Sequence, residues 1–514
     1  MTQGGVWVYL GVFARKKKNK SGVISIQIID KSKGKCRLLK TIGSSAVSSE
    51  VERFFNEGKE WIKRYTGVQE FDFTDYNHHT QLILQGIEQI SVYGPELLLG
   101  KIFDEVGFNQ INDDLFKRLV LARLCFPVSK LKTTDYLSKY QFWDIDVHVV
   151  YRYLDKLYKQ QKETVQRISY HHTLRILNNI VSVVFYDVTT LYFEAESEDD
   201  LRKTGFSKDG KHQHPQIVLG LLVSKGGYPL AYDIFSGNQF EGHTMLPIIE
   251  AFKSKYNLDK LVVVADSGLL SKENIQLLEQ GGYEYILGAR IRAVDKKLKE
   301  QILSLVLNSG ESTVIKVNEK TKLIVSYSQV RAKKDNYNRE RGLAKLEKQI
   351  KSGKLTKASI NNRGYNKFLQ IESEVKVSVS NQRIEDDKKW DGLKGYITNA
   401  SLSKEEVLEN YKDLWQIEKA FRIAKTDLEI RPIYHRLQRR IEAHICLAFV
   451  AYKIYKELER QLKFKKTTMS AEQAIDIAKT IYGVKVVHPI TSQITYATII
   501  RSDEQQYLAK LFNF

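Results

Sequence analysis

An acidic residue interrupts an apolar run at residues 182–196, which read SVVFYDVTTLYFEAE. Residues Val183–Tyr186 are typical of a buried strand, and Asp187 lies inside the run because Val188 and Leu191 continue it. A buried carboxylate without a partner is strongly disfavoured. Asp187 therefore requires a cation, a network of hydrogen-bond donors or a metal ion.

A second acidic residue follows another apolar strand. In KLVVVADSGLLSKENI, the run Leu261–Ala265 ends at Asp266, and Ser271 can cap the helix that follows. Open α/β sheets place site residues at the carboxyl ends of their strands, so Asp266 is a candidate for a site. The alternative is an aspartate that only shapes a turn.

A third candidate is Glu418, in the stretch ENYKDLWQIEKAFRIAKTDLEIRP. The spacing predicts one amphipathic helix with an apolar stripe, formed by Leu414, Ile417, Phe421, Ala424 and Leu428. Tyr411, Glu418 and Lys425 are seven residues apart in turn, which places them on one line of a continuous helix. The alternative is a surface glutamate with a nearby lysine.

Three converging carboxylates favour metal-dependent phosphoryl transfer. Mg²⁺ and Mn²⁺ prefer oxygen ligands, and a pair of such ions can activate the attacking oxygen and stabilise the leaving one. A nearby lysine and tyrosine suit the same chemistry, because phosphoryl transfer depends mainly on positioning and charge stabilisation. We therefore expect Asp187, Asp266 and Glu418 to share two divalent ions.

The elements that position these acids indicate an α/β fold. We expect strands at 181–193, 216–224, 228–235, 261–265 and 283–288, with helices near 244–255 and 272–280. Three meandering strands followed by alternating helices and strands predict a mixed sheet covered by helices. A β-rich insertion is expected at 296–400, helices from 403 to 464, and a helix, two strands and a helix in the tail from 470.

The N-terminal half differs in pattern. Residues 6–42 predict a basic β-meander whose first turn carries Arg15, Lys16, Lys17 and Lys18, either as a phosphate-contacting arm or as a solvated hairpin tip. A helix is expected from about Ser49 to Tyr65. Residues 85–178 have helical periodicity throughout and form a module that can bind DNA.

Charge and composition favour a polyanionic partner. The chain has 514 residues, a formal net charge of +19 and only three cysteines. This excess of positive charge is common in proteins that bind nucleic acid, and a generally basic surface is the alternative. The cysteines are far apart, and no cysteine or carboxylate lies at zinc-ligand spacing from the histidines at 171, 172, 212 and 214, which argues against a zinc site. Without an apolar run of membrane-spanning length or a signal peptide, a cytoplasmic location is expected.

Further basic residues are candidates for DNA contact. They are Arg331, Lys333, Lys334 and the helix predicted over Arg339–Lys357, for which a solvated charged face is the alternative. His444, in RRIEAHICLAF, is expected to be a helix residue with satisfied hydrogen bonds rather than a catalyst.

These motifs resemble the DDE transposases of bacterial insertion sequences, in the IS-four-like superfamily. The matching segments are FYDVTTLYFE, VVADSGLLS and Y-x6-E-x6-K, and the resemblance extends from the meander to RPIYHRLQRRIEAHICLAF. It implies an RNase H-like core interrupted by the insertion, with Asp187, Asp266 and Glu418 as the triad that binds two Mg²⁺ ions. Mn²⁺ is expected to substitute for Mg²⁺.

The resemblance also assigns residues to DNA. Tyr411 and Lys425 would contact the backbone near the cleaved end, and Thr189 and Thr190 would steady the strand. The family has an arginine three residues after the tyrosine, where this chain has Leu414, and Lys412 or Arg422 would substitute for it.

The implied reaction is hydrolysis at the element's end followed by attack of the freed 3′-hydroxyl on a second phosphodiester. Double-stranded DNA, as transposon ends and target, and a second copy of the chain in a homodimer are the implied partners. The alternatives are an RNase H-like nuclease that cuts without joining, or a DNA-binding protein without catalysis. The expected domains are the meander with its helix (1–75), a helical domain for DNA binding or dimerisation (76–178), the first core part (179–295), the insertion (296–400), the second core part (401–465) and a C-terminal region (466–514).

Overall fold

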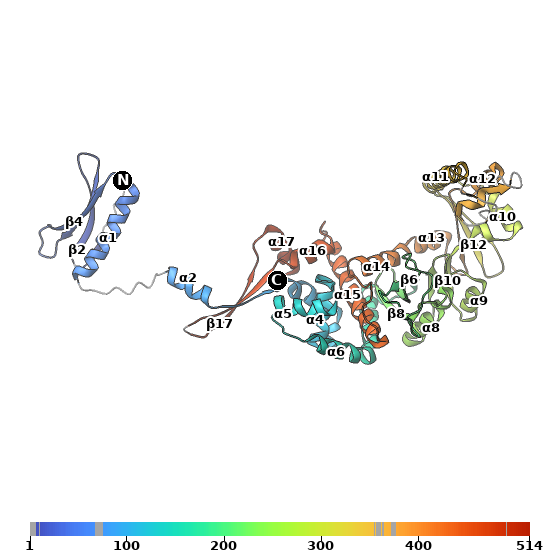
Figure 1. Ribbon diagram of the computed structural model, residues 1–514, viewed down its shortest axis with the longest axis horizontal. Coiled ribbons are helices and arrows are strands. Elements are labelled where there is room, and N and C mark those ends of the chain that lie inside the picture. Colours follow the sequence, from blue (N-terminus) through green and yellow to red (C-terminus); the bar gives the residue numbers. More distant parts are fainter. Residues whose placement is uncertain are drawn as a thin grey trace. The chain divides into compact units, whose positions relative to one another are not determined.

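The computed structural model describes residues 7–9, 11–66, 76–353, 355, 361, 364–371, 377–489 and 491–514. The chain divides into two compact units (Figure 1). The first unit comprises Met1–Ile87 with Val487–Gln493, and the second comprises Glu88–Val486 with Ile494–Phe514.

The first unit contains a four-stranded antiparallel sheet and a helix that covers it. The strands follow in chain order: β1 (Trp7–Tyr9), β2 (Val12–Lys18), β3 (Ile24–Asp30) and β4 (Arg37–Ser45). Alternating apolar residues of the strands pack against the apolar stripe of α1 (Ser48–Thr66). Within the described residues, the predicted meander and the helix after it are confirmed. Helix α2 (Tyr76–Gln85) follows.

The basic cluster of this unit was predicted in the first turn, but it lies on a strand. Arg15–Lys18 belong to β2, where Lys18 still pairs with Ile24 of β3, and the turn is made by Asn19–Gly22. Pairing continues past the last apolar residue because ladder hydrogen bonds need no apolar side chain. Lys16 is bound to Glu52 of α1, whereas Lys17 and Lys18 are exposed.

The second unit begins with a strand where a helix was predicted. Ile87–Val92 forms β5, which lies in a three-stranded sheet beside β16 (Tyr482–Val487) and β17 (Ile494–Ile499). Its partners come from the far end of the sequence, so local periodicity gives no sign of them. The tail elements α16 (Ala471–Ala478) and α17 (Asp503–Phe512) confirm the predicted order of the C-terminal region.

A helical layer follows β5 and packs on the longest helix of the chain. That helix is α15 (Gln438–Phe464), which is 27 residues long and almost wholly buried along its length. It is contacted by the earlier helices α3 (Lys101–Val106), α4 (Asp114–Cys125), α6 (Val147–Gln160) and α7 (Lys162–Ile176). Helix α5 (Lys130–Gln141) lies between α4 and α6 in the chain. Apart from β5, the predicted helical character of 85–178 is confirmed.

An eight-stranded mixed sheet forms the centre of this unit, in the order β11-β12-β15-β10-β9-β6-β7-β8. Strands β6 (Val183–Tyr192), β7 (Gln216–Ser224) and β8 (Pro229–Ser236) form an antiparallel meander. Strands β9 (Val262–Ala265) and β10 (Glu284–Ala289) run parallel to β6. The predicted mixed sheet is confirmed, with strand ends within about two residues of those expected.

Helices cover both faces of the sheet. Helices α8 (Met245–Tyr256) and α9 (Lys272–Gln280) pack on one face, and α14 (Trp415–Thr426) and α15 lie toward the other (Figure 1). The two core clusters separate along β6, since Tyr186 and Val188 face α8 whereas Phe185 and Leu191 face α14 and α15. This alternation decides which residues of each strand can reach a helix.

The segment 296–400 is more helical than the predicted β-rich insertion. It contains α10 (Lys296–Leu303), the 23-residue helix α11 (Gln329–Lys351) and α12 (Asn381–Lys388), besides the short strands β13 (Leu369–Ile371) and β14 (Val377–Val379). Strands β11 (Ser312–Lys316), β12 (Lys322–Tyr327) and β15 (Leu393–Thr398) continue the central sheet, because β15 pairs with β10. The predicted end of the basic helix, near Lys357, lies outside the described residues.

The predicted continuous helix through Tyr411 and Lys425 is broken. Helix α13 (Lys404–Lys412) ends before α14 begins, and Asp413 and Leu414 lie between them. In the break, the Leu414 N–H donates to the Tyr411 carbonyl and the Ile417 N–H donates to the Leu414 carbonyl. These hydrogen bonds span three residues, as in a 3₁₀-helix, and not four, as in an α-helix. Tyr411 therefore lies on a different helix from Glu418, and a seven-residue spacing does not align them.

Candidate active site

Asp187 and Asp266 are neighbours on parallel strands. The register of β6 and β9 ends with the pair Tyr186 and Ala265, so the next residue of each strand is an aspartate. Phe185 of β6 and Val264 of β9 lie in the core beneath α14 and α15. Asp187 is two residues after Phe185, and Asp266 is two residues after Val264. Because residues two apart in a strand share a face, both aspartates belong to the face that α14 covers. Two distant segments are brought together in this way.

Asp187 lies in a largely buried place, with 18% of its side chain exposed. Its Oδ1 accepts a hydrogen bond from the N–H of Val188 at 2.7 Å, and Lys208 Nζ lies 3.7 Å away. Burial raises the pKa of Asp187 to about 6; Lys208 opposes that rise, while Asp266 and Glu241 add to it. The cation that the buried carboxylate requires is therefore supplied in part by Lys208.

Lys208 and Glu241 are site residues that the sequence did not reveal. Lys208 Nζ donates to the carbonyl of Val188 at 2.7 Å and lies 3.2 Å from Glu241 Oε1. Burial alone would lower the pKa of Lys208, but Asp187 and Glu241 outweigh it and raise that pKa. No spacing in the sequence connects Lys208 or Glu241 to the two aspartates.

Thr190 holds the loop that carries Lys208. Its Oγ1 accepts a hydrogen bond from the Lys208 N–H at 3.1 Å, and its side chain is buried. Thr190 therefore fixes the start of this loop against β6. This hydrogen bond is a specific role, beyond the general preference of β-branched residues for strands.

Asp266 also shapes the turn after β9. Its Oδ1 accepts hydrogen bonds from the N–H groups of Gly268, at 2.8 Å, and Leu269, at 3.3 Å. Asp266 can therefore be both a turn residue and a site residue, because the turn uses only one of its two carboxylate oxygens. Within the described residues, Oδ2 of Asp187 and Oδ2 of Asp266 accept no hydrogen bond.

Tyr411 connects the aspartates to Glu418. Its ring is buried, and the pKa of its hydroxyl is raised by burial first and then by Asp266, Tyr396 and Glu418. The hydroxyl reaches the end of β10 because Gly288 has no side chain: a Cβ there would lie 2.5 Å from Tyr411 Oη. The close approach places a phenol between the turn of Asp266 and the helix of Glu418.

The donor set fits a divalent cation at the aspartate pair but not a closed triad. Two adjacent carboxylates, each with an unused oxygen, are suitable ligands for Mg²⁺ or Mn²⁺. In the described parts of the chain, however, no three His, Cys, Asp or Glu side chains lie close enough to hold one metal ion. The strand register thus joins Asp187 with Asp266, whereas Glu418 is related to Asp266 through Tyr411, whose hydroxyl pKa both carboxylates raise.

Cationic side chains border the site on the Glu418 side. Lys394 Nζ lies 4.5 Å from the Tyr411 ring centroid, and burial and Arg331 lower its pKa while Glu418 raises it. Arg331, at the start of α11, is close enough to lower the pKa values of Lys394 and Tyr411, and it pairs with Asp335 at 3.7 Å. Lys333 and Lys334 are exposed on the same helix.

Lys425 is occupied by an ion pair. Its Nζ lies 3.3 Å from both carboxylate oxygens of Asp209, which Arg431 also binds. Burial lowers the pKa of Lys425, and Asp209 opposes this effect. Arg422, on the same helix, is exposed. The ion pair of Lys425 with Asp209 therefore connects α14 to the loop that carries Lys208.

Two other expectations need correction. Arg339, the first residue of the stretch expected to follow a DNA backbone, has only 4% of its side chain exposed and binds Asp387 and Asp391. His444 is not fully satisfied: its Nε2 lies 3.1 Å from the Ile430 carbonyl, but its buried Nδ1 has no partner. Sequence spacing cannot reveal which charged groups fold inward against an opposite charge.

In the described part of the chain, no helix combines the length and the apolar character needed to cross a lipid bilayer. Comparison with family models matches residues 181–454 to the transposase DDE domain. Among solved structures, the chain is similar to the piggyBac transposase in a synaptic complex with hairpin DNA, with 7% identity, a TM-score of 0.39 and coverage of 78% of this chain and 79% of that one. Comparison with curated proteins gives no match.

Proposed function

The chain belongs to the family of transposases with a DDE domain, enzymes that act on DNA, and from this membership we propose that it is the transposase of a bacterial insertion sequence. In this proposal it binds the terminal inverted repeats, cleaves the DNA at the element's ends and joins those ends to a target. The observation that carries the proposal is the pairing of Asp187 with Asp266 on the face covered by α14.

The topology supports an RNase H-like core. The strand order β8-β7-β6-β9-β10, with an antiparallel meander and then two parallel strands, is the order that such a core requires. The first aspartate lies on the central strand β6, and the second follows its parallel neighbour. Segment 296–400 separates these strands from the Glu418 helix in the chain, as an insertion would.

Divalent metal ions serve transposases of this family generally, and we assign Mg²⁺ to this chain. Asp187 and Asp266 would hold it through their unused oxygens, with Glu418 as the proposed third carboxylate. Such an ion supplies an activated water or hydroxyl and stabilises the charge on the leaving oxygen. Lys394 and Arg331 would bind the phosphate of the scissile strand, and the phenol of Tyr411 would orient it.

One observation favours a second candidate, a DNA-binding protein without catalysis. Glu418 does not share a metal-binding group with the aspartates among the described residues. A nuclease that cuts without joining is the other alternative. All three functions predict DNA binding, so the products of the reaction must distinguish them.

The deciding experiment incubates the full chain with linear DNA that carries the element's terminal repeats, a supercoiled target and Mg²⁺. Joined products with short target duplications would support the transposase, whereas cut ends without joining would support the nuclease. Absence of both products, together with retained DNA binding, would support the non-catalytic protein. Asp259→Asn, which changes an exposed acid before β9, is the matched control for Asp187→Asn and Asp266→Asn.

We also propose that two copies of the chain pair two DNA ends. Size-exclusion chromatography with light scattering, without DNA and with end-length duplexes, would measure the number of chains in each complex. A single chain bound to each duplex, under conditions that give joined products, would contradict the homodimer.

A further inference from the structure

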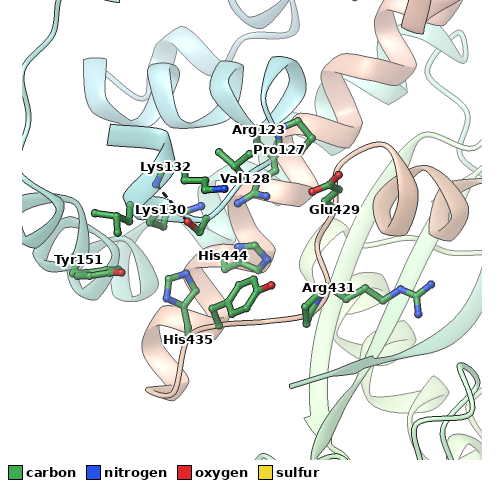
Figure 2. A pocket seen from close by; sticks show the side chains of 14 residues that line it. Arg123, Pro127, Val128, Lys130, Lys132, Tyr151, Glu429, Arg431, His435 and His444 are labelled. Carbon is green, nitrogen blue, oxygen red and sulfur yellow. Dashed lines mark hydrogen bonds between the residues drawn. The ribbon is translucent and has the colours of Figure 1, made fainter. Parts of the chain in front are cut away.

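A pocket of about 520 Å³ lies between the N-terminus of α5 and the segment that joins α14 to α15 (Figure 2). Its lining includes several cationic and imidazole side chains, among them Arg123, Lys130, Lys132, His435 and His444. Glu429 is the one carboxylate among the lining residues, and it is exposed. Arg431 also lines the pocket, but its guanidinium extends away from the other lining side chains (Figure 2) and binds Asp209.

Lys130 is the most unusual residue of this pocket. Only 5% of it is exposed, yet among the described residues its ammonium has neither an acidic partner nor a hydrogen-bond acceptor. Burial lowers the pKa of Lys130 well below its ordinary value, and the nearby Arg123 lowers it further. Most buried lysines are paired, because an uncompensated buried charge costs several kcal/mol.

Arg123 adds a second buried cation. It is 5% exposed, and Nη1 makes one long hydrogen bond of 3.4 Å to the Leu428 carbonyl. Burial lowers the pKa of Arg123 to about 10, and Glu429 opposes this effect. A guanidinium has five donors, so most of its hydrogen-bonding capacity is not used by protein acceptors.

Of the two histidines, His435 supplies a further donor. The His444 ring lies 5.6 Å from the His435 ring, between centroids; because its Nε2–H donates to the Ile430 carbonyl, its buried Nδ1 is an acceptor, which has no partner among the described residues. Burial lowers the pKa of His435 to about 3, so this imidazole is neutral and carries one N–H donor. Asp155, the nearest acid behind His435, is held by Arg439 and Arg440 and does not neutralise the pocket.

The backbone contributes in the same direction. The pocket includes Ser129, the N-cap of α5, and Lys130, its first residue. The N-terminus of a 12-residue helix presents free N–H groups and a partial positive charge to an anion. By itself this would not define a site, but here it coincides with the buried ammonium of Lys130, which is unpaired among the described residues.

We propose that this pocket is a phosphate-binding site, separate from the aspartate pair, that takes a phosphodiester of the DNA backbone. A phosphate offers the acceptor oxygens and the negative charge that Lys130, Arg123 and the N–H of His435 lack. DNA is the source that the family implies, since its members act on DNA. The assignment does not depend on the metal site or on the inverted repeats.

The first test measures binding of inorganic phosphate to the full chain by calorimetry at constant ionic strength. Lys130→Met should weaken binding about tenfold or more, because it removes a buried charged donor. Lys132→Met, at the exposed rim of the pocket, should weaken it severalfold. The control Lys139→Met changes an exposed lysine of α5 outside the lining and should leave the affinity unchanged.

Thermal unfolding separates this role from a structural one. Without phosphate, Lys130→Met should raise the melting temperature, because it removes an uncompensated buried charge. The matched control is Lys453→Met: Lys453 is equally buried but donates to the Ser169 carbonyl and to Thr173 Oγ1, so its loss should lower the melting temperature. A fall for Lys130→Met without any change in phosphate affinity would overturn the proposal.

The source of the phosphate is tested with a short duplex of arbitrary sequence. Lys130→Met should weaken duplex binding about tenfold and reduce the salt dependence by roughly one phosphate contact. If this variant loses inorganic phosphate but binds the duplex normally, the pocket takes a free phosphate compound and the DNA assignment is wrong. Asp187→Asn should retain binding in both assays, so a failure of the catalytic proposal appears separately, as lost cleavage alone.

Discussion

Asp187 and Asp266 are adjacent on parallel strands, immediately beyond the last ladder pair of β6 and β9, and each leaves one carboxylate oxygen without a hydrogen bond among the described residues. Two negative side chains at this separation disfavour one another, and the pKa of Asp187 is raised by burial and further by Asp266. Lys208 offsets only part of this cost. The arrangement is therefore less stable without an added cation than with one.

Substitution of Asp187 should reveal this cost directly. Asp187→Asn should abolish metal-dependent cleavage and, in metal-free buffer at neutral pH, raise the free energy of unfolding by about 1–3 kcal/mol, because a buried charge is removed. Chemical denaturation and a plasmid-cleavage assay measure the two effects. Asp259→Asn should change neither. Unaltered cleavage by Asp187→Asn would remove this residue from the site.

Metal ions should stabilise the wild-type chain through the aspartate pair. Addition of Mg²⁺ or Mn²⁺ should raise the melting temperature, since a ligand that binds only the folded state shifts unfolding by mass action. The increase should vanish in Asp266→Asn and be reversed by a chelator. Glu418→Gln should lose cleavage but keep much of this increase, because Glu418 lies outside a common group with the aspartates. An equal increase in Asp266→Asn would contradict metal binding there.

The space beside Gly288 should be essential to the position of Tyr411. A Cβ at residue 288 would lie 2.5 Å from Tyr411 Oη, so Gly288→Ala should destabilise the fold by about 1–3 kcal/mol and reduce cleavage. Combining it with Tyr411→Phe should recover part of the lost stability but not the cleavage. Denaturant unfolding of the two single variants and the double variant gives the coupling energy. Strict additivity would show that the two residues are not in contact as described.

One ion pair gives a pH-dependent contribution with a definite sign. Hydrogen bonds from Arg440 lower the pKa of Asp155 to about 2, from an ordinary 3.8, with burial opposing the shift and Arg439 adding to it. Since the folded-state pKa is the lower one, the stabilisation is complete above about pH 4 and disappears as the pH falls through 2. Asp155→Asn should cost about 1 kcal/mol at pH 7, a modest value because the pair is partly exposed. The difference between variant and wild type, measured by urea unfolding, should shrink over this acidic interval and remain constant from pH 5 to pH 8.

The exposed start of α11 should contribute to DNA binding through charge. Replacing Arg331, Lys333 and Lys334 with glutamine should weaken duplex binding and reduce the slope of log affinity against log salt by up to about three contacts. Lys463, Lys465 and Lys466, which are exposed at the C-terminal end of α15 and are not candidates for DNA contact, form the matched control set. Fluorescence anisotropy over a range of chloride concentrations measures both slopes. Equal slopes for the two triple variants would mean that the start of α11 does not touch the backbone.

Local patterns along the chain are enough to predict the central sheet and its two aspartates. Apolar runs with turn residues between them locate β6 to β10, and the break in the first run marks Asp187, because local periodicity and the cost of burying charge are properties of short segments. The membership of the DDE family was also recognisable from the segments around these acids. The prediction for Glu418 came from the same kind of reasoning, yet it assumed a helix that the structure divides between α13 and α14.

Which charged groups face one another depends on the folded chain and could not be predicted from the sequence. Lys208, Glu241 and Lys394 meet the acids across loops and strands that no spacing relates, Lys425 pairs with Asp209, and Arg339 folds inward between two aspartates. The unpaired Lys130 and the orphaned nitrogen of His444 become visible only once α5 and α15 are packed. The physical reason is that the desolvation and pairing of a charge depend on all neighbours in space, whereas a sequence pattern reports only neighbours along the chain.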